Sequence, residues 1–308
     1  MGLLAEKPEI DFRTLYKSPL VHVSDYDCHA HESGQSAEEQ SENNSIVLMR
    51  HGTFAKHFGK RQVTADVNQA VFFSKDSVYR ISHPAECGDR GTVFIIAPRV
   101  LKDIIRELDP TVDEHADQPF NFVTGPCDLG IFRRHRDFVM RLEGAESEPL
   151  EHLWADETAL QLVADVLDSA FDHHGKAPEV RRESTAKDHA ERTEAAKTYL
   201  ATRLSEAVTL NEVARAVHAS PFNFARIFQQ QTGLPVHRYL TQLRLRVSLE
   251  RLADGESDLT NLALDLGFSS HSHFTDVFRR ELGVTPSEIR KTSIRKISKN
   301  LIAGRSPQ

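Results

Sequence analysis

The strongest constraint on the fold of this 308-residue chain is a pattern that occurs twice near its C-terminal end. Four residues of one copy recur 50 positions later in the other: Ser220, Phe224, Phe228 and Gly233, then Ser270, Phe274, Phe278 and Gly283. Ala214 recurs as Ala263, at an offset of 49. Each copy predicts a short helix, a tight turn and a second helix, and the alanine permits the close helix approach that a helix-turn-helix motif requires.

Helix-start signals stand at matching places in the two copies. Thr209 and Glu212 form a capping box, in which a hydroxyl and a carboxylate satisfy free backbone donors. Asp258 holds the equivalent place in the second copy, and Ser220-Pro221 supplies a cap followed by proline at the first helical position. These signals predict mostly short, separately capped helices.

A longer amphipathic helix is predicted over residues 236–253, between the two copies. Its inward side carries Tyr239, Leu240, Leu243, Val247 and Leu252. About 18 residues span roughly 27 Å, and successive major-groove openings on one face of DNA are about 34 Å apart. Two modules joined by such a helix would therefore fit adjacent grooves of one duplex.

The second helix of each copy has a buried face and an outward face. The buried faces carry Phe224, Ile227 and Phe228, then Phe274, Val277 and Phe278. The outward rows carry Phe222, Ala225, Arg226 and Gln229, then Ser272, Thr275, Asp276 and Arg279, with His271 beside them. Reading base edges in a major groove requires such rows. An ordinary solvated face is the alternative for one helix alone, but the duplication favours DNA recognition.

Charge is divided unevenly along the chain, whose net charge is −7. Residues 1–186 hold 20 basic and 32 acidic residues, a net charge of −12. Residues 187–308 hold 18 basic and 13 acidic residues, a net charge of +5. This asymmetry indicates a basic module attached to an acidic one.

The region from Thr209 to Arg290 resembles the C-terminal DNA-binding domain of AraC/XylS-type transcriptional regulators. The most specific part of the resemblance is Ala263, Gly267-Phe268-Ser269, His273-Phe274, Val277-Phe278-Arg279-Arg280 and Gly283-Val284-Thr285-Pro286. With the helix before it, the resemblance covers residues 190–291. It implies seven helices, two helix-turn-helix units and double-stranded DNA bound through both recognition helices.

The resemblance also implies which side chains meet DNA. The base-facing positions are Phe222, Ala225 and Arg226 in the first unit, and His271, Ser272, Thr275 and Asp276 in the second, while the outward row adds Gln229. Phosphate contacts are expected from Arg279, Arg280, Arg290 and Lys291. Asp276 only accepts hydrogen bonds and would repel phosphate. The first unit, and Arg226 above all, is therefore expected to provide most base discrimination.

The N-terminal half predicts β structure over residues 20–97, because short runs rich in Val, Ile and Phe alternate with polar turns. Helical periodicity follows over residues 98–108, 129–142 and 150–171. Residues 32–44 are nearly devoid of apolar side chains and predict a mobile loop. The segment containing Tyr79-Arg80-Ile81-Ser82-His83-Pro84 and Gly88-Asp89 is similar to cupin-type effector and dimerisation domains.

The expected fold class is thus α+β. A cupin-like β-barrel or sandwich with covering helices occupies residues 1–174, and a polar linker follows at residues 175–188. An all-α double helix-turn-helix domain occupies residues 189–296, and a flexible tail ends the chain at residues 297–308.

Two side chains of the β domain are candidates for effector binding. Arg80 and His83 could bind an anionic molecule inside the barrel. The alternative is a salt bridge from either of them to Asp89 or Asp66.

A metal site in the β domain is a separate hypothesis, and no metal is assigned. Cys28, His29 and His31 have the residue types of a metal-cupin site, and Cys87 near His83 could extend it or act as a redox-sensitive thiol. The alternative is a polar loop entrance that happens to contain histidines.

The favoured interpretation is a cytoplasmic, sequence-specific transcriptional regulator rather than an enzyme, with no cofactor. Its expected partners are double-stranded DNA, a small-molecule effector, a second copy in a homodimer, and RNA polymerase if it activates. No membrane is expected, since no stretch approaches the roughly 20 apolar residues of a membrane span. Two alternatives stay open: a metal-dependent cupin enzyme with a helical appendage, and a regulator whose N-terminal half only dimerises.

Overall fold

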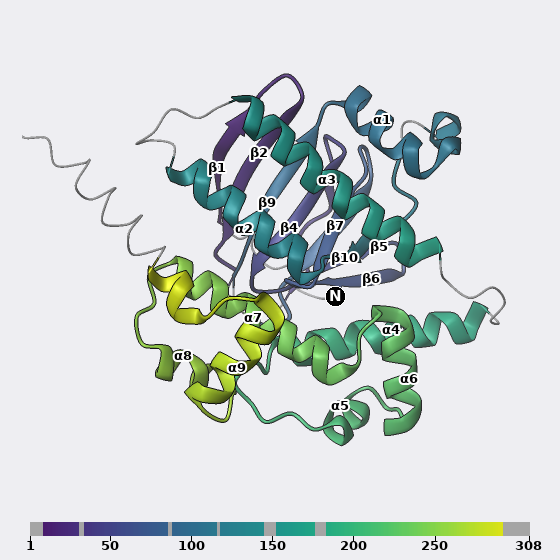
Figure 1. Cartoon of the computed structure of the whole chain (residues 1–308). Helices are drawn as coiled ribbons and strands as arrows, with labels where there is room; N and C mark the ends of the chain where they lie inside the picture. Colours follow the sequence, from purple (N-terminus) through teal and green to yellow (C-terminus); the bar gives the residue numbers. More distant parts are fainter. Residues whose placement is uncertain are drawn as a thin grey trace, which may run out of the picture.

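The computed structural model of the chain describes residues 9–30, 34–85, 88–115, 118–144, 152–175 and 183–291. In this part of the chain, antiparallel sheets and three longer helices form the N-terminal half, and residues 183–291 are helical (Figure 1). The predicted α+β class is confirmed. The predicted tail, residues 297–308, lies outside the described residues.

The larger sheet has six strands in the order β1-β2-β9-β4-β7-β10. Its strands are β1 (Ile10–Lys17), β2 (Val21–Cys28), β4 (Ser45–His51), β7 (Gln69–Phe73), β9 (Asp89–Ile96) and β10 (Thr124–Pro126). Strand β9 pairs with both β2 and β4. It therefore lies in the middle of the sheet, although it follows most of the other strands in the sequence. This long-range pairing fixes which residues of β2 and β9 are neighbours.

The smaller sheet has four strands in the order β3-β8-β5-β6. They are β3 (Glu39–Gln40), β5 (Phe54–Phe58), β6 (Arg61–Ala65) and β8 (Val78–Ser82). The loop predicted over residues 32–44 is therefore wrong in part. Its backbone pairs along β8, with Ser36 N donating to Ile81 O at 2.7 Å and Ser41 N donating to Ser77 O at 3.0 Å. Backbone pairing orders this segment, although it has few apolar side chains.

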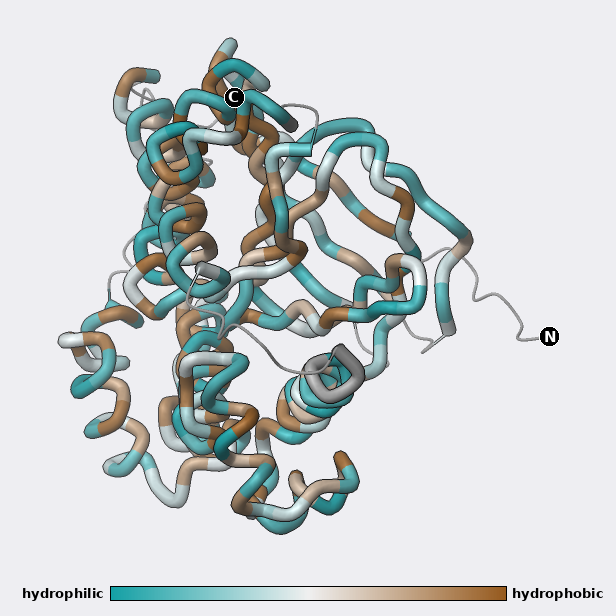
Figure 2. The backbone as a smooth tube through the Cα atoms, turned by 90° about the vertical axis from the view of Figure 1, so that its right-hand side faces the viewer, coloured by the Kyte–Doolittle hydropathy of each residue, from teal (hydrophilic) through white to brown (hydrophobic). Residues whose placement is uncertain are grey.

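Helices cover one face of the larger sheet, as predicted (Figure 1). They are α2 (Leu129–Glu143) and α3 (His152–Gly175), while α1 (Pro98–Leu108) follows β9. The buried stripe of α3 is rich in small residues, including Ala155, Ala159 and Ala170. A Cβ on Gly125 of β10 would lie 2.5 Å from Ala170 Cβ, so this glycine permits the close approach of α3. Seen from the side in Figure 2, helices and strands both carry hydrophobic segments.

The predicted linker of residues 175–188 is too long. Gly175 is the last residue of α3, residues 176–182 lie outside the described residues, and α4 spans Glu183–Ala201. The polar sequence of residues 183–188 lacks proline and glycine, so it can continue a helix despite its loop-like composition.

The C-terminal helices follow the predicted duplication closely. They are α5 (Leu210–Ala216), α6 (Pro221–Thr232), α7 (Val236–Ala253), α8 (Leu259–Asp265) and α9 (His271–Leu282). Residues 286–291 are helical again, which completes the seven helical segments that the resemblance implied. The joining helix has the predicted limits, and its five predicted inward residues are all buried.

Helix α7 also contacts the β sandwich, which the sequence did not predict. The Tyr239 hydroxyl donates to Asp66 Oδ2 at 2.6 Å, and Asn68 Nδ2 donates to Tyr239 O at 3.2 Å. Arg246 is fully buried and donates to Asn68 Oδ1 and, at 2.5 Å, to Cys127 O. One turn further along, Glu250 Oε1 lies 2.6 Å from Arg136 Nε of α2. The helix that joins the two repeats is thus buried between the two halves of the protein.

Candidate nucleic-acid interface and ligand cavity

The first repeat is a helix-turn-helix unit made of α5 and α6. The capping box is formed, because Glu212 N donates to Thr209 Oγ1 at 3.3 Å and Thr209 N donates to Glu212 Oε2 at 2.8 Å. The Thr209 hydroxyl also donates to Glu212 Oε2 at 2.7 Å, and this bond, followed by the one from Thr209 N, lowers the pKa of the Glu212 carboxyl. Ala214 is buried, and its carbonyl accepts from Ala219 N at 2.9 Å across the turn. The turn therefore holds α6 close against α5.

The second repeat has the same construction in α8 and α9. Asp258 Oδ1 caps α8 by accepting from Thr260 N at 3.0 Å and from Asn261 N at 2.9 Å. The Ala263 carbonyl accepts from Phe268 N at 3.0 Å, as the Ala214 carbonyl does in the first repeat.

Left-handed residues occupy the same place in both turns. His218 has φ 52°, and Gly267 has φ 70°. The geometry is repeated even though the residue type is not, because both turns reverse the chain over the same short distance.

The outward row of α6 lies on the surface, as predicted. Phe224, Ile227 and Phe228 are buried, whereas Arg226 and Gln229 are exposed, together with Asn223, and Ala225 is half-buried. Phe222 is 81% exposed, an unusual position for a phenylalanine. An exposed aromatic next to an exposed arginine offers both an apolar contact for a thymine methyl and a hydrogen-bond donor for guanine.

The outward row of α9 is also on the surface. His271, Ser272 and Asp276 are exposed, and Thr275 is half-buried. His271 Nε2 lies 3.4 Å from Thr275 Oγ1, so two members of the row contact each other. The row is therefore available for a partner, with one acidic group, Asp276, at its centre.

The four predicted phosphate-binding residues differ in their surroundings. Arg279, Arg280 and Lys291 are exposed. Arg280 Nε lies 3.2 Å from Glu281 Oε1. Arg290 donates from Nη1 to Ser257 O at 2.6 Å, which ties its guanidinium to the loop before α8. Arg279, Arg280 and Lys291 thus present positive charge beside α9.

A cavity of about 450 Å³ lies between the two sheets of the N-terminal half. Most of its lining is apolar and includes Phe54, Phe73, Ile81 and Val93. Its volume is within the range of about 300–1,000 Å³ that is usual for small-molecule sites.

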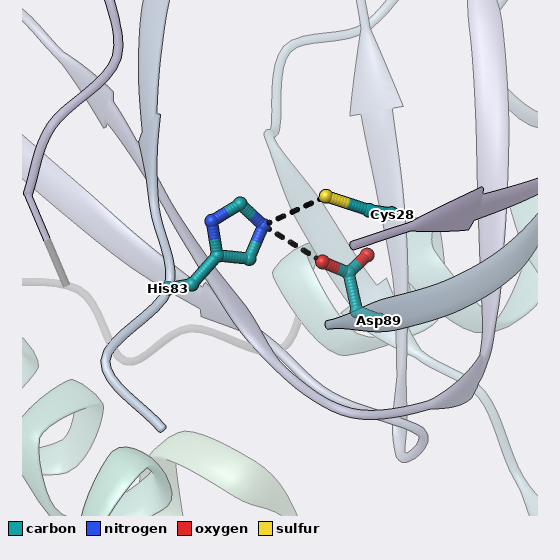
Figure 3. A group of neighbouring side chains, drawn as sticks. All are labelled: Cys28, His83 and Asp89. Carbon is teal, nitrogen blue, oxygen red and sulfur yellow. Dashed lines mark hydrogen bonds and ion pairs between the residues drawn. The ribbon is translucent and has the colours of Figure 1, made fainter. Parts of the chain in front are cut away.

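One part of the cavity wall is polar and buried, where Cys28, His83 and Asp89 meet (Figure 3). Cys28 Sγ lies 3.4 Å and Asp89 Oδ2 lies 2.9 Å from His83 Nε2. Burial opposes a positive charge on His83, but its contacts with Asp89 and Cys28 outweigh burial and raise its pKa to about 9. The Tyr26 hydroxyl donates to Asp89 Oδ1 at 2.7 Å, and burial followed by the Asp89 charge raises the pKa of Tyr26 well above its usual value.

The two predicted effector-binding residues are separated in the structure. His83 lines the cavity and forms the alternative ion pair with Asp89. Arg80 is not among the lining residues, since its guanidinium donates to Ser36 O at 3.1 Å and to Glu38 Oε2 at 3.5 Å. Side chains three residues apart along an extended strand point to opposite faces, which explains why only one of them reaches the cavity.

Only Cys28 and His29 of the cysteine–histidine motif at residues 28–31 lie within the described part of the chain. Both line the cavity, but Cys28 is buried, whereas His29 is exposed and lies beside Asp11, with Nε2 at 3.2 Å from Oδ2. His31 and Cys87 lie outside the described residues. The partners of Cys28 come from distant segments, and Asp89 and Tyr26 had not been identified as site residues from the sequence.

The C-terminal helices match a known domain. Residues 213–292 match the family described as "Helix-turn-helix domain". The C-terminal region of this chain thus matches a helix-turn-helix domain, as the resemblance implied. In the described part of the chain, no helix is both long and apolar enough to cross a membrane.

Particular relatives share this domain. The HTH-type transcriptional activator RhaS of Escherichia fergusonii is 36% identical over 93 residues, which are 30% of this chain and 34% of RhaS. The regulatory protein PocR of Salmonella typhimurium is 31% identical over 93 residues, 30% of this chain and 31% of PocR. The match thus spans about a third of each relative. Among solved structures, ToxT from Vibrio cholerae O395 aligns over 89% of this chain and 98% of its own, with 12% identity and a TM-score of 0.33.

Proposed function

We propose that this protein is a sequence-specific DNA-binding transcriptional regulator that uses α6 and α9 as recognition helices. The observation that carries the proposal is the repeated geometry: two helices with equivalent buried faces present polar rows to solvent, and α7 joins them. In helix-turn-helix proteins this is the arrangement that enters a major groove. Of the relatives that share the domain, RhaS is named as a transcriptional activator and PocR as a regulatory protein, which supports the same function.

Base discrimination in this proposal comes chiefly from Arg226. Its exposed guanidinium can donate two parallel hydrogen bonds to guanine O6 and N7, and a good bidentate pair contributes about 1–3 kcal/mol of discrimination. Phe222 adds apolar contact. The second unit contributes less, because the carboxylate of Asp276 lies in the middle of its row and disfavours a close phosphate.

The test uses the full-length protein and duplexes that it selects from a random pool. Binding should weaken linearly with the logarithm of salt concentration, because each neutralised phosphate releases counterions. Arg226→Ala should relax the preference at one base position by about 1–3 kcal/mol. Arg279→Ala should weaken all duplexes alike and reduce the salt slope by about 1.

Arg134→Ala is the matched control. Arg134 is a half-exposed arginine on α2 that pairs with Asp165, and its removal changes the net charge equally. It should leave both selectivity and salt slope unchanged. Salt-independent binding, or equal losses for Arg134→Ala and Arg226→Ala, would contradict the proposal.

The cavity between the sheets is proposed to bind the small-molecule effector. Its volume, its largely apolar lining and its buried cluster of polar side chains are the features of a ligand site. A compound that occupies it should raise the melting temperature of the protein, since binding to the native state stabilises it. Phe73→Trp, which partly fills the cavity, should reduce that shift. Homodimer formation and contact with RNA polymerase belong to the proposal on the strength of the family resemblance alone.

A further inference from the structure

The Cys28, His83 and Asp89 side chains converge from separate segments. Cys28 is the last residue of β2 and is the register partner of Asp89, the first residue of β9. Neighbouring partners in an antiparallel pair project to the same face. His83 reaches them from the other sheet, just after β8. The three side chains are 3%, 5% and 2% exposed, so they are held together inside the protein.

The distances suit a common metal ligand set. The Sγ, Nε2 and carboxylate oxygen atoms all lie within 4.8 Å of one another, and the two contacts to Nε2 are 3.4 and 2.9 Å long. Zinc ligands at about 2.0–2.3 Å in a tetrahedron are separated from one another by about 3.3–3.6 Å. The two contacts to His83 Nε2 differ from these separations by a few tenths of an ångström. Figure 3 shows both neighbours on the side of the ring that carries this nitrogen.

Hydrogen bonding among the three groups is incomplete without an ion. Asp89 Oδ2 is buried, and among the described residues it has an ion pair with His83 Nε2 at 2.9 Å but no separate hydrogen-bond partner. Cys28 Sγ approaches the same Nε2, which carries at most one hydrogen. One nitrogen cannot direct that hydrogen or its lone pair at both neighbours. A cation between the three atoms would satisfy all of them.

A supporting residue is also in place. The other oxygen of Asp89 accepts from the Tyr26 hydroxyl at 2.7 Å, so the free oxygen is directed toward His83 and Cys28. Ligating carboxylates are commonly held in this way by a second group, and loss of that group typically weakens metal binding 10- to 100-fold. The sulfur and nitrogen donors favour zinc over magnesium or calcium, which prefer oxygen.

We propose that Cys28 Sγ, His83 Nε2 and Asp89 Oδ2 bind one Zn²⁺ ion whose fourth coordination position opens into the cavity between the sheets. Three protein ligands leave one position of a tetrahedral zinc ion free, and all three residues line the cavity. That position would take water, or a donor atom of a molecule in the cavity. The proposal concerns the N-terminal half and does not depend on DNA binding by the C-terminal domain.

The experiment uses full-length protein freed of metal with a chelator and titrated with Co²⁺ as a spectroscopic probe for the zinc site. A thiolate–cobalt charge-transfer band in the near ultraviolet should saturate at one equivalent and disappear when Zn²⁺ is added. Cys28→Ser should abolish the band. Cys127→Ser is the matched control, because Cys127 is an equally buried free cysteine that is not in the cluster, and it should keep the band.

Two further variants separate ligands from support. Asp89→Asn should lower the affinity for Co²⁺ at least tenfold. Tyr26→Phe should lower it 10- to 100-fold while keeping the charge-transfer band, as expected for a group that positions a ligand. Circular dichroism establishes that each variant is folded. Absence of a band from folded wild-type protein, or a band that survives in Cys28→Ser, would overturn the proposal. DNA binding, measured separately by its salt slope, would be unaffected by either result.

Discussion

Arg246 of α7 provides the sharpest test of how the two halves of the protein are held together. It is fully buried and donates to Asn68 Oδ1, to Cys127 O and, at 3.0 Å, to Gln242 Oε1 of its own helix. The first two acceptors belong to the β sandwich, so these bonds cross between the halves. In Arg246→Met, a side chain of similar length keeps much of the packing but donates no hydrogen bond.

The expected loss follows from the acceptors left behind. Asn68 and Cys127 are both buried, and a buried acceptor that loses its donor costs about 1–3 kcal/mol. Together they cost about 2–6 kcal/mol. Burial of the guanidinium opposes its charge and lowers the pKa of Arg246, and its removal recovers part of that penalty. We therefore expect Arg246→Met to lower the free energy of unfolding by about 2–4 kcal/mol.

Urea unfolding with two probes measures this loss. Trp154, the single tryptophan of the chain, lies on α3 and reports on the N-terminal half, while far-ultraviolet circular dichroism is dominated by helices of both halves. The variant should unfold at lower urea, and the two transitions should separate as docking weakens. Arg238→Met is the control, because Arg238 is half-exposed and pairs with Glu281, which also belongs to the helical domain. A change below about 0.5 kcal/mol in Arg246→Met, with coincident transitions, would refute the reasoning.

Three further predictions concern single side chains. Burial lowers the pKa of Lys56 to about 7 from its usual 10.5, so between these pH values the folded state binds fewer protons than the unfolded state. The stability of the wild type relative to Lys56→Met should therefore rise between pH 7 and 10 by up to about 1.4 kcal/mol per pH unit. A difference in urea midpoint that does not change with pH would contradict this prediction. Gly267→Ala places a Cβ 2.8 Å from Leu204 O in a residue with φ 70°, so the melting temperature of this variant should fall by several degrees. Gly144→Ala places its Cβ in open space and should leave the melting temperature of the protein nearly unchanged. Asp258→Ala removes the cap of α8 and should cost about 1 kcal/mol in urea unfolding, and no loss would show that the cap contributes nothing.

The helical domain was largely predictable because its information is local. The caps and the apolar spacing of α6 and α9 lie within short windows, and helices depend on such windows. The 50-residue offset between Phe224 and Phe274 then shows that the same local pattern occurs twice. The limits of α7 were predicted correctly for the same reason. Exposure of Arg226 and Gln229 followed directly from the helical period.

The cavity site was not predictable because it depends on strand register. Cys28 and Asp89 are 61 residues apart and become neighbours only through the pairing of β2 with β9. A register shift by one residue would move one of them to the opposite face. Nothing near either residue specifies that register, so the sequence directed attention to the adjacent His29 instead. Strand β1 was missed for a related reason: only one of its eight residues, Tyr16, is buried, and its apolar alternation is weak.

The contact between the two halves was not predictable from the sequence because it is made by polar and charged side chains. Arg246 and Glu250 lie on a side of α7 that contacts the N-terminal half, whereas charged side chains are normally solvent-exposed. They are buried because the β sandwich covers that side.

Strand β7 connects the two proposed binding sites. Its residue Phe73 lines the cavity, while Asn68, directly before the strand, contacts Tyr239 and Arg246 of α7. A molecule in the cavity can alter DNA affinity only if it favours one arrangement of such contacts over another. Because α7 joins the two helix-turn-helix units, the hydrogen bonds of Asn68 are among the contacts whose rearrangement would reach both units at once.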